Sequence, residues 1–312
     1  MCKLKKIIGS LLLVCLLLLA GCGVQPEAPK NKLKVVTTLF ATYDFARQVG
    51  GDAVEVSMLL PPGADSHVYE LTPKDIAQLK NCDVFIYVGG ESDEWLKKIL
   101  NSFTEKKMQQ VRLLDIIKPV LEKEKEGMTV KHAGEEQEVD EHVWTSPRNA
   151  IIIVQKLSEV FSRLDKSQQE AYKERSRQYV AKLQQIDKEY QAIVAAGKRK
   201  TLIFGDRFPL RYFVDAYGLD YYAAFPGCAQ NTEPSAATVA FLIKKIKAEH
   251  IPVIFHIELS NKKIAQALSE ATGTKIVQFN TGHNVTKQEF EQGVTYLDLL
   301  EQNGRALKEA LQ

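Results

Sequence analysis

The chain has 312 residues, of which 41 are basic and 39 acidic, so its formal net charge at pH 7 is only +2. Three of the lysines lie at positions 3, 5 and 6, and without them 38 basic side chains stand against 39 acidic ones, a net charge of −1. A balance this close to neutral does not favour nucleic-acid binding. The length is sufficient for two modest hydrophobic cores and favours two lobes over one.

The first 21 residues have the pattern of an export signal. Basic residues precede an apolar run at 7–19, which is too short for an ordinary membrane-spanning helix. The run ends in Leu19-Ala20-Gly21-Cys22, which matches the bacterial lipobox, where cleavage leaves Cys22 to carry lipid chains. We therefore expect a signal peptide at 1–21, a lipid on Cys22 and a flexible tether at 22–32, with the protein anchored at the outer face of the cell membrane.

Only two of the five cysteines, Cys82 and Cys228, remain once the signal and the lipid-bearing residue are set aside. The sequence therefore predicts no disulfide scaffold. Cys82 opens an apolar run at 82–88 and is expected to be a small buried core residue. Cys228 differs, because it lies in a turn-rich segment at 225–231.

Short β-rich runs alternate with helical patterns between residues 33 and 165, which we expect to form an N-terminal lobe. The predicted strands lie at 33–38, 54–59, 84–88 and 111–114. The predicted helices lie at 41–49, 73–80, 94–103 and 148–164. This alternation is typical of an α/β lobe with a mainly parallel sheet.

A single long helix is predicted from residue 167 to about 196, within a linking segment at 166–198. Its apolar residues recur at spacings of three, four and seven, which places them on one stripe: Tyr172, Tyr179, Leu183, Ile186, Tyr190 and Ile193. About 30 residues at a rise of 1.5 Å span on the order of 45 Å. A helix of this length can join two lobes.

A second alternation follows at 199–312, the expected C-terminal lobe. Its predicted strands lie at 201–204, 221–225, 253–257 and 275–279, with helices between and after them. The fold class is therefore α/β, with two lobes that each hold a mainly parallel four-stranded sheet flanked by helices. The long helix joins them.

A charged stretch at 121–141 interrupts the N-terminal lobe. It has no apolar periodicity and contains glycines and His132, so a mobile surface loop is expected. The alternative is a loop that collects metal weakly through His132 and its carboxylates.

Two short segments each place one of the chain's six histidines among acidic and aromatic residues: Asp65-Ser66-His67-Val68-Tyr69-Glu70 and Asp140-Glu141-His142-Val143-Trp144. Imidazole is a favoured ligand of zinc, and loops that follow strands can point side chains into a cleft. In an exported protein, His67 and His142 are therefore candidate metal ligands. Tyr69, Glu70, Asp140 or Trp144 could hold the other ring nitrogen or shield the site.

These motifs carry a resemblance to a known family. The lipobox, the runs at 60–70 and 140–147, the long helix and the segments 212–219 and 233–235 together resemble the zinc/manganese substrate-binding lipoproteins of bacterial ABC transporters. The resemblance covers nearly the whole mature chain. It implies two α/β lobes bridged by one long helix, with a single metal in the cleft between them. His67 and His142 match the family's two ligands from the N-terminal lobe.

The C-terminal lobe departs from the family pattern. The position where the family has its third ligand holds Arg207, which cannot donate a lone pair, and the place of the last ligand holds Asn280. His283 lies in the same loop as Asn280 and could substitute. For the remaining position Cys228, Asp206 and Glu258 compete, all near ends of predicted strands, and we favour Cys228. Asp206 could instead pair with Arg207.

The other histidines have ordinary structural explanations. His250 ends the helix predicted at 235–249, where the helix dipole favours an imidazolium. His256 lies inside a predicted strand, where a hydrogen-bonded core role is expected.

The sequence thus predicts a monomeric extracytoplasmic receptor that captures Zn²⁺ and delivers it to an ABC permease, without enzymatic activity. Manganese is the alternative cargo, although a nitrogen-rich site with a possible thiolate favours zinc. A zinc hydrolase would need a general base such as Glu258, and the common hydrolase motifs are not found in the sequence. A surface adhesin would share the anchor, and no sequence motif separates it from the receptor.

The lipid anchor is testable through Cys22. We expect Cys22→Ser to release the protein from membranes while zinc binding stays intact, because the lipid rather than the folded domain holds it there. Fractionation after a salt and carbonate wash measures this. A variant that remains in the membrane fraction would contradict the assignment.

Overall fold

The computed structural model describes residues 32–64, 69–90, 93–103, 108–123, 125–128, 138–227 and 234–312. The expected signal peptide, Cys22 and most of the tether lie outside these residues, as do His67, His132 and Cys228. Residues 32–312 cluster as one compact unit.

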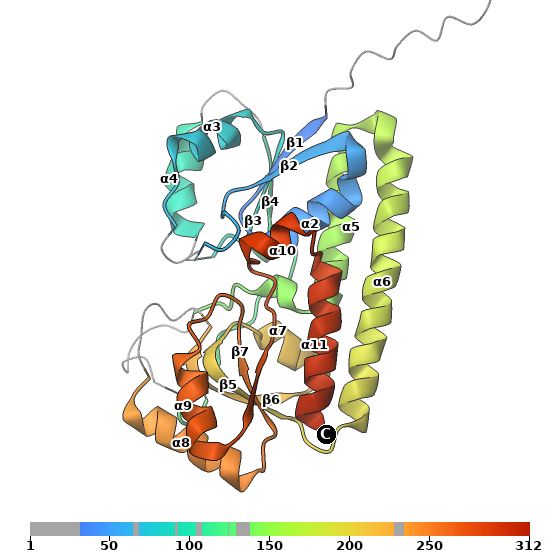
Figure 1. Ribbon diagram of the computed structural model, residues 1–312. Coiled ribbons are helices and arrows are strands. Elements are labelled where there is room, and N and C mark those ends of the chain that lie inside the picture. Colours follow the sequence, from blue (N-terminus) through green and yellow to red (C-terminus); the bar gives the residue numbers. More distant parts are fainter. Residues whose placement is uncertain are drawn as a thin grey trace, which may run out of the picture. The chain divides into compact units, whose positions relative to one another are not determined.

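Two four-stranded sheets, both entirely parallel, organise this unit (Figure 1). The first has the order β2-β1-β3-β4, with β1 at Leu33–Thr37, β2 at Val54–Met58, β3 at Val84–Tyr87 and β4 at Gln109–Arg112. The second has the order β6-β5-β7-β8, with β5 at Thr201–Phe208, β6 at Asp220–Pro226, β7 at Val253–His256 and β8 at Lys275–Gln278. In each sheet the central pair forms a switch point, where ligands are commonly bound beyond the carboxyl ends of the strands.

Helices connect and cover the strands. The first half of the chain forms α2 (Phe40–Gly50), α3 (Pro73–Asn81), α4 (Glu94–Ser102) and α5 (Pro147–Leu164). The second half forms α7 (Arg211–Tyr217), α8 (Ala236–Ala248), α9 (Lys263–Thr272), α10 (Lys287–Glu291) and α11 (Tyr296–Leu311). Between the halves runs α6 (Gln169–Ala196), whose 28 residues confirm the predicted long helix.

The buried stripe of α6 nearly matches the predicted one. Five of the six predicted residues are buried: Tyr172, Tyr179, Leu183, Ile186 and Tyr190. At the end of the stripe, Val194 is buried instead of Ile193. These side chains belong to a core that continues from the first sheet through α5 and α6 to the second sheet. A separate smaller core fills the outer face of each sheet. The halves therefore share one main core, where the sequence predicts two.

Two of the predicted strands differ from the structure. The fourth strand begins at Gln109 rather than Val111, and residues 113–115 form a 3-10 turn instead of its end. The fifth continues to Phe208, because its pairing with β6 resumes at Arg207 after an irregularity that follows Phe204. Asp206 and Arg207 therefore lie within a strand rather than in the loop after it.

Described parts of the charged insertion at 121–141, which the sequence predicts to be a mobile surface loop, contact the second half of the chain. Lys125 pairs with Asp220 and lies 5.2 Å from the ring centre of Tyr221. Tyr221 donates to the carbonyl of Lys123 over 3.1 Å, and Met128 is buried. Lys125, one of the charges that suggest a solvated loop, thus has a partner on β6.

The last segment of the chain returns to the first half. In Figure 1, α10 lies beside α2 and α11 runs along α6. Val285 and Leu299 pack with Phe40 of α2 in a small apolar cluster. Residues beyond 280 therefore do not belong to the second half alone.

Asp44 of α2 ties three helices together. It is 1% exposed. Its carboxylate accepts from the hydroxyl of Tyr179 on α6 at 3.1 Å and from the first backbone N–H of α11, that of Tyr296, at 3.0 Å. Gln48 donates a third bond of 3.1 Å. A carboxylate at the amino end of α11 also interacts favourably with the helix dipole.

Burial raises the pKa of Asp44 above its ordinary value, even though its hydrogen bonds oppose that shift. The folded state therefore binds the proton more readily than the unfolded state, and the free energy of unfolding falls as pH rises from the unfolded pKa through the folded one. We expect the wild type to lose stability relative to Asp44→Asn as the pH rises above the ordinary aspartate pKa of about 4. Denaturant titration measures this, with Asp115→Asn at an exposed position as control. A stability difference independent of pH would contradict the shift.

Candidate metal centre

His142 lies where the charged insertion ends and α5 is about to begin. The backbone N–H of His142 donates to Oδ1 of Asp140 at 2.8 Å, which folds the chain back on itself. A 3-10 turn at 143–145 follows, and the Thr145 hydroxyl donates to the carbonyl of His142 at 2.8 Å. The histidine is only 5% exposed. Its backbone is thus fixed on both sides.

The carboxylate of Asp140 also orients the ring of His142. Its Oδ1 lies 3.1 Å from Nδ1, so Nδ1 is the nitrogen that carries the proton and Nε2 keeps a free lone pair. Burial alone would lower the pKa of His142, but the charges of Asp140 and Glu141 raise it above its ordinary value. A carboxylate on the outer nitrogen of a histidine is the usual support of a metal ligand. Of the four residues that the sequence offers for holding a ring nitrogen or shielding the site, Asp140 holds Nδ1 of His142.

His283 lies in the loop after β8, and Glu258 organises this loop. The Glu258 carboxylate accepts from the backbone N–H of Thr281 at 2.7 Å, from its hydroxyl, and from the backbone N–H of His283 at 3.1 Å. Between them, Gly282 has a φ of +72°, a conformation that side chains rarely adopt. Burial raises the pKa of Glu258, although these bonds oppose the shift.

The same loop caps α2 of the first half. Leu39, at the N-cap position of α2, has no side chain that can accept a hydrogen bond. The carbonyls of His283 and Gly282 accept instead, from the first two backbone N–H groups of the helix, at 2.9 and 3.0 Å. The loop therefore supplies the acceptors that the amino end of a helix requires.

Asn284 extends this attachment to the segment that leads to His67. Its side-chain amide donates to the carbonyls of Pro61 at 2.9 Å and Ala64 at 2.8 Å. Ala64 is the last described residue before His67, which stands three positions further along.

The indole of Trp144 lies against both His142 and His283. Its ring centre lies 5.4 Å from that of His142 and 5.5 Å from that of His283, while the two imidazole centres are 6.3 Å apart. The indole N–H donates to the carbonyl of Thr281 at 3.0 Å. Two imidazoles that share a tetrahedral zinc have centres about 5 Å apart, given Zn–N bonds of about 2.0–2.1 Å. The observed separation of 6.3 Å is thus about 1 Å longer than that of two imidazoles bound to one zinc ion.

The structure brings together His142 and His283, but it does not complete the predicted ligand set. Among the described residues, no group of three or more histidine, cysteine, aspartate or glutamate side chains is placed to hold a metal. His67 and Cys228 lie outside the described residues.

The two tentative carboxylates are already engaged. Asp206 accepts from the backbone N–H of Arg207 at 2.8 Å and of Ile257 at 3.2 Å, so it meets the backbone of Arg207 rather than its guanidinium. Glu258 holds the His283 loop, as described above. Both carboxylates therefore act on the chain around the site.

Three further sequence predictions can be compared with the structure. Tyr69 donates to Asp75 at the start of α3, at 2.7 Å, and so is not the partner of His142. His256 is buried at the end of β7, with its Nδ1 2.8 Å from the carbonyl of Ile257, which confirms the core role. His250 follows α8 and is exposed.

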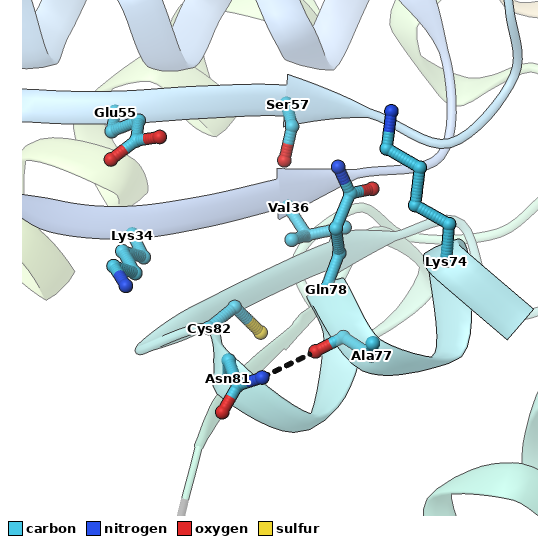
Figure 2. A pocket seen from close by; sticks show the side chains of 9 residues that line it. All are labelled: Lys34, Val36, Glu55, Ser57, Lys74, Ala77, Gln78, Asn81 and Cys82. Atoms are coloured by element: carbon cyan, nitrogen blue, oxygen red, sulfur yellow. Dashed lines mark hydrogen bonds between the residues drawn. The ribbon is translucent and has the colours of Figure 1, made fainter.

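Cys82 is 1% exposed and donates to the carbonyl of Leu79 at 3.1 Å, as expected of a core residue. It also lines a groove of about 280 Å³ between α3 and the strands β1 and β2 (Figure 2). The described lining contains no histidine: Lys34, Val36, Glu55, Ser57, Lys74, Ala77, Gln78, Asn81 and Cys82. This groove is therefore separate from the histidine pair.

Sequence reasoning missed Asn284 and the backbone of α2 as partners of the segments around the site. Asn284 acts through contacts more than 200 residues away in sequence. The absence of a capping side chain at Leu39 was the one local signal that an outside acceptor must exist.

In the described part of the chain, no helix combines the length and apolar character needed to span a bilayer.

The role of Glu258 can be tested by Glu258→Gln. Glutamine keeps one acceptor oxygen where three donors converge, so we expect the His283 loop to loosen and zinc affinity to fall about tenfold, as for other supporting residues of metal sites. Competition with a chelator measures the affinity. Glu270→Gln on the exposed face of α9 is the control. Equal affinities of both variants would show that the loop does not need Glu258.

The chain is similar to proteins of a known family. The sequence model of ZnuA, described as zinc-uptake complex component A, periplasmic, matches residues 35–310. The chain is 30% identical over 308 residues to the zinc-binding lipoprotein AdcA of Streptococcus pneumoniae R6. The aligned region covers 98% of this chain and 61% of AdcA. The chain thus spans about three fifths of that relative. It is also 30% identical to the high-affinity zinc uptake system protein ZnuA of Bacillus subtilis, with 95% of each covered.

Solved structures agree with the fold. The Zn(II)-bound ZnuA-like domain of Streptococcus pneumoniae AdcA has a TM-score of 0.74 at 29% identity, over 90% of this chain and 99% of that one. The metal-dependent lipoprotein YcdH of Bacillus subtilis has a TM-score of 0.76 at 30% identity, over 90% and 100%. With a family match across almost all described residues, the chain belongs to the ZnuA family of periplasmic zinc-uptake components.

Proposed function

We propose that this protein is the extracytoplasmic receptor of a zinc importer, which captures Zn²⁺ between its two halves and delivers it to an ABC permease. One observation carries this proposal. His142, before α5, and His283, after β8, lie against the same indole, and a carboxylate holds Nδ1 of His142. Family membership supports the same function.

The proposed ligands are His67, His142 and His283, with Cys228 as the fourth. His67 follows the segment that Asn284 holds, so this loop supports two of the proposed ligands. Cys228 is proposed because the carboxylates of Asp206 and Glu258 already accept backbone N–H groups. We keep the division into lobes at 33–165 and 199–312 as part of this proposal.

Zinc is proposed over manganese because of the donor atoms. Three imidazoles and a thiolate match the preference of Zn²⁺ for nitrogen and sulfur, whereas Mn²⁺ prefers carboxylate oxygens. The relatives named for zinc agree with this choice. The manganese receptor remains the alternative within the family.

We also propose that the protein acts as a monomer anchored through lipid on Cys22, and that it has no catalytic role. A hydrolase would need a general base with a free lone pair near the metal. Glu258, the candidate for that role, follows β7 and instead accepts three hydrogen bonds from the loop after β8. Transport therefore fits this geometry better than hydrolysis.

The proposal predicts a steep pH dependence. Protons compete with zinc for the imidazoles, so binding should weaken markedly as pH falls through roughly 6 to 5. We expect His142→Ala and His283→Ala each to lower zinc affinity at least about tenfold, and His250→Ala, an exposed histidine, to leave it unchanged.

Competitive titration with zinc and manganese measures these affinities, and elemental analysis of protein purified without added metal identifies the cargo. Equal and small losses for all three variants would contradict the site. Stoichiometric manganese instead of zinc would favour the alternative cargo.

A further inference from the structure

We infer that Tyr212, on α7 of the second half, is a positioning residue for His142 and acts on it through Asp140. The inference rests on the proposed function, because it assigns Tyr212 a part in holding a zinc ligand. Tyr212 is 6% exposed and lies across the boundary between the halves.

The hydroxyl of Tyr212 joins the two ends of the charged insertion. It accepts from the backbone N–H of Val120 at 3.2 Å and donates to the carbonyl of Asp140 at 2.9 Å. The backbone N–H of Asp140 donates in turn to the carbonyl of Val120 at 2.9 Å. One phenol thus closes a ring of three hydrogen bonds at the base of the insertion.

Asp140 passes this constraint to the imidazole. Its backbone is fixed by Tyr212 and Val120, and its Oδ1 meets both the backbone N–H and the Nδ1 of His142, at 2.8 and 3.1 Å. A shift of the Asp140 backbone would therefore move the atom that orients the ring. A metal ligand that is displaced or turned binds less well, because the geometry around the ion is strict.

The phenol suits this role at any physiological pH. Burial raises the pKa of Tyr212 to about 12, so the hydroxyl keeps the proton that it donates to Asp140. Removal of the hydroxyl would leave the Val120 N–H and the Asp140 carbonyl without this partner, and unmet buried groups are costly.

This arrangement makes a ligand of the first half depend on the second half. Tyr212 follows β5, a strand of the second sheet, whereas His142 precedes α5, a helix of the first half of the chain. The position of this ligand therefore depends on a hydrogen bond from the second half.

Tyr212→Phe tests the inference, with Tyr221→Phe as a matched control. Tyr221 is also a buried phenol of the second half that donates to a carbonyl of the same insertion, but that carbonyl belongs to Lys123 and not to Asp140. We expect Tyr212→Phe to speed zinc dissociation about tenfold, which is near the lower end of the effects that loss of a residue supporting a metal ligand usually has. Tyr221→Phe should leave the rate unchanged. Transfer of zinc to an excess of chelator measures both rates.

Nitrogen NMR of ¹⁵N-labelled histidine gives a readout that general destabilisation does not change. We expect His142 to carry its proton on Nδ1 in the metal-free wild type and to show a mixture of tautomers in Tyr212→Phe. In an Asp140→Asn background the added Tyr212→Phe change should have no further effect on the dissociation rate. If Tyr212→Phe fails to fold, 3-fluorotyrosine at position 212 keeps the hydroxyl as a stronger donor and should slow dissociation.

The outcomes separate this inference from the proposed function. Unchanged dissociation and tautomer in Tyr212→Phe, or equal effects of Tyr212→Phe and Tyr221→Phe, would overturn the inference while leaving the receptor intact. Loss of zinc affinity in His142→Ala would still support the proposed function in that case. If His142→Ala binds zinc as the wild type does, the proposed site itself fails.

Discussion

The amino end of α2 needs hydrogen-bond acceptors, and the carbonyls of Gly282 and His283 provide them. Because Leu39 cannot cap the helix, a loop from the far end of the chain must reach the first half. That loop carries His283 and is held from the other side by Glu258. The proposed ligand therefore belongs to both halves at once, and the geometry of the site depends on this shared loop.

Each half of the chain contributes a segment that is bound to the other half. Residues beyond 280 attach to the first half, and the insertion at 121–128 attaches to β6 of the second half through Lys125 and Tyr221. Each such hydrogen bond contributes a net of only about 0.5–1.5 kcal/mol, but they must break together if the sheets are to separate. Together with the continuous core along α6, they favour small local adjustments around the metal over a wide opening.

The sequence predicted the parts of the fold that follow from local pattern. Periodicity was sufficient for the long helix, and the alternation of strands and helices was sufficient for two parallel sheets. It was not sufficient for the return of α10 and α11 to the first half, because contacts such as Asn284 with Pro61 leave no local pattern. For the site, Asp140 could be predicted because it stands two residues from His142. Tyr212 could not, because its link to Asp140 exists only after folding.

The central claim is that His142 and His283 bind the same zinc ion, and zinc K-edge X-ray absorption of the loaded protein tests it most directly. We expect a four-coordinate shell with three imidazoles and one sulfur in the wild type, and the loss of one imidazole in His283→Ala. His250→Ala should give the wild-type spectrum. An unchanged imidazole count in His283→Ala would contradict the account, because it would show that the shared loop does not reach the metal.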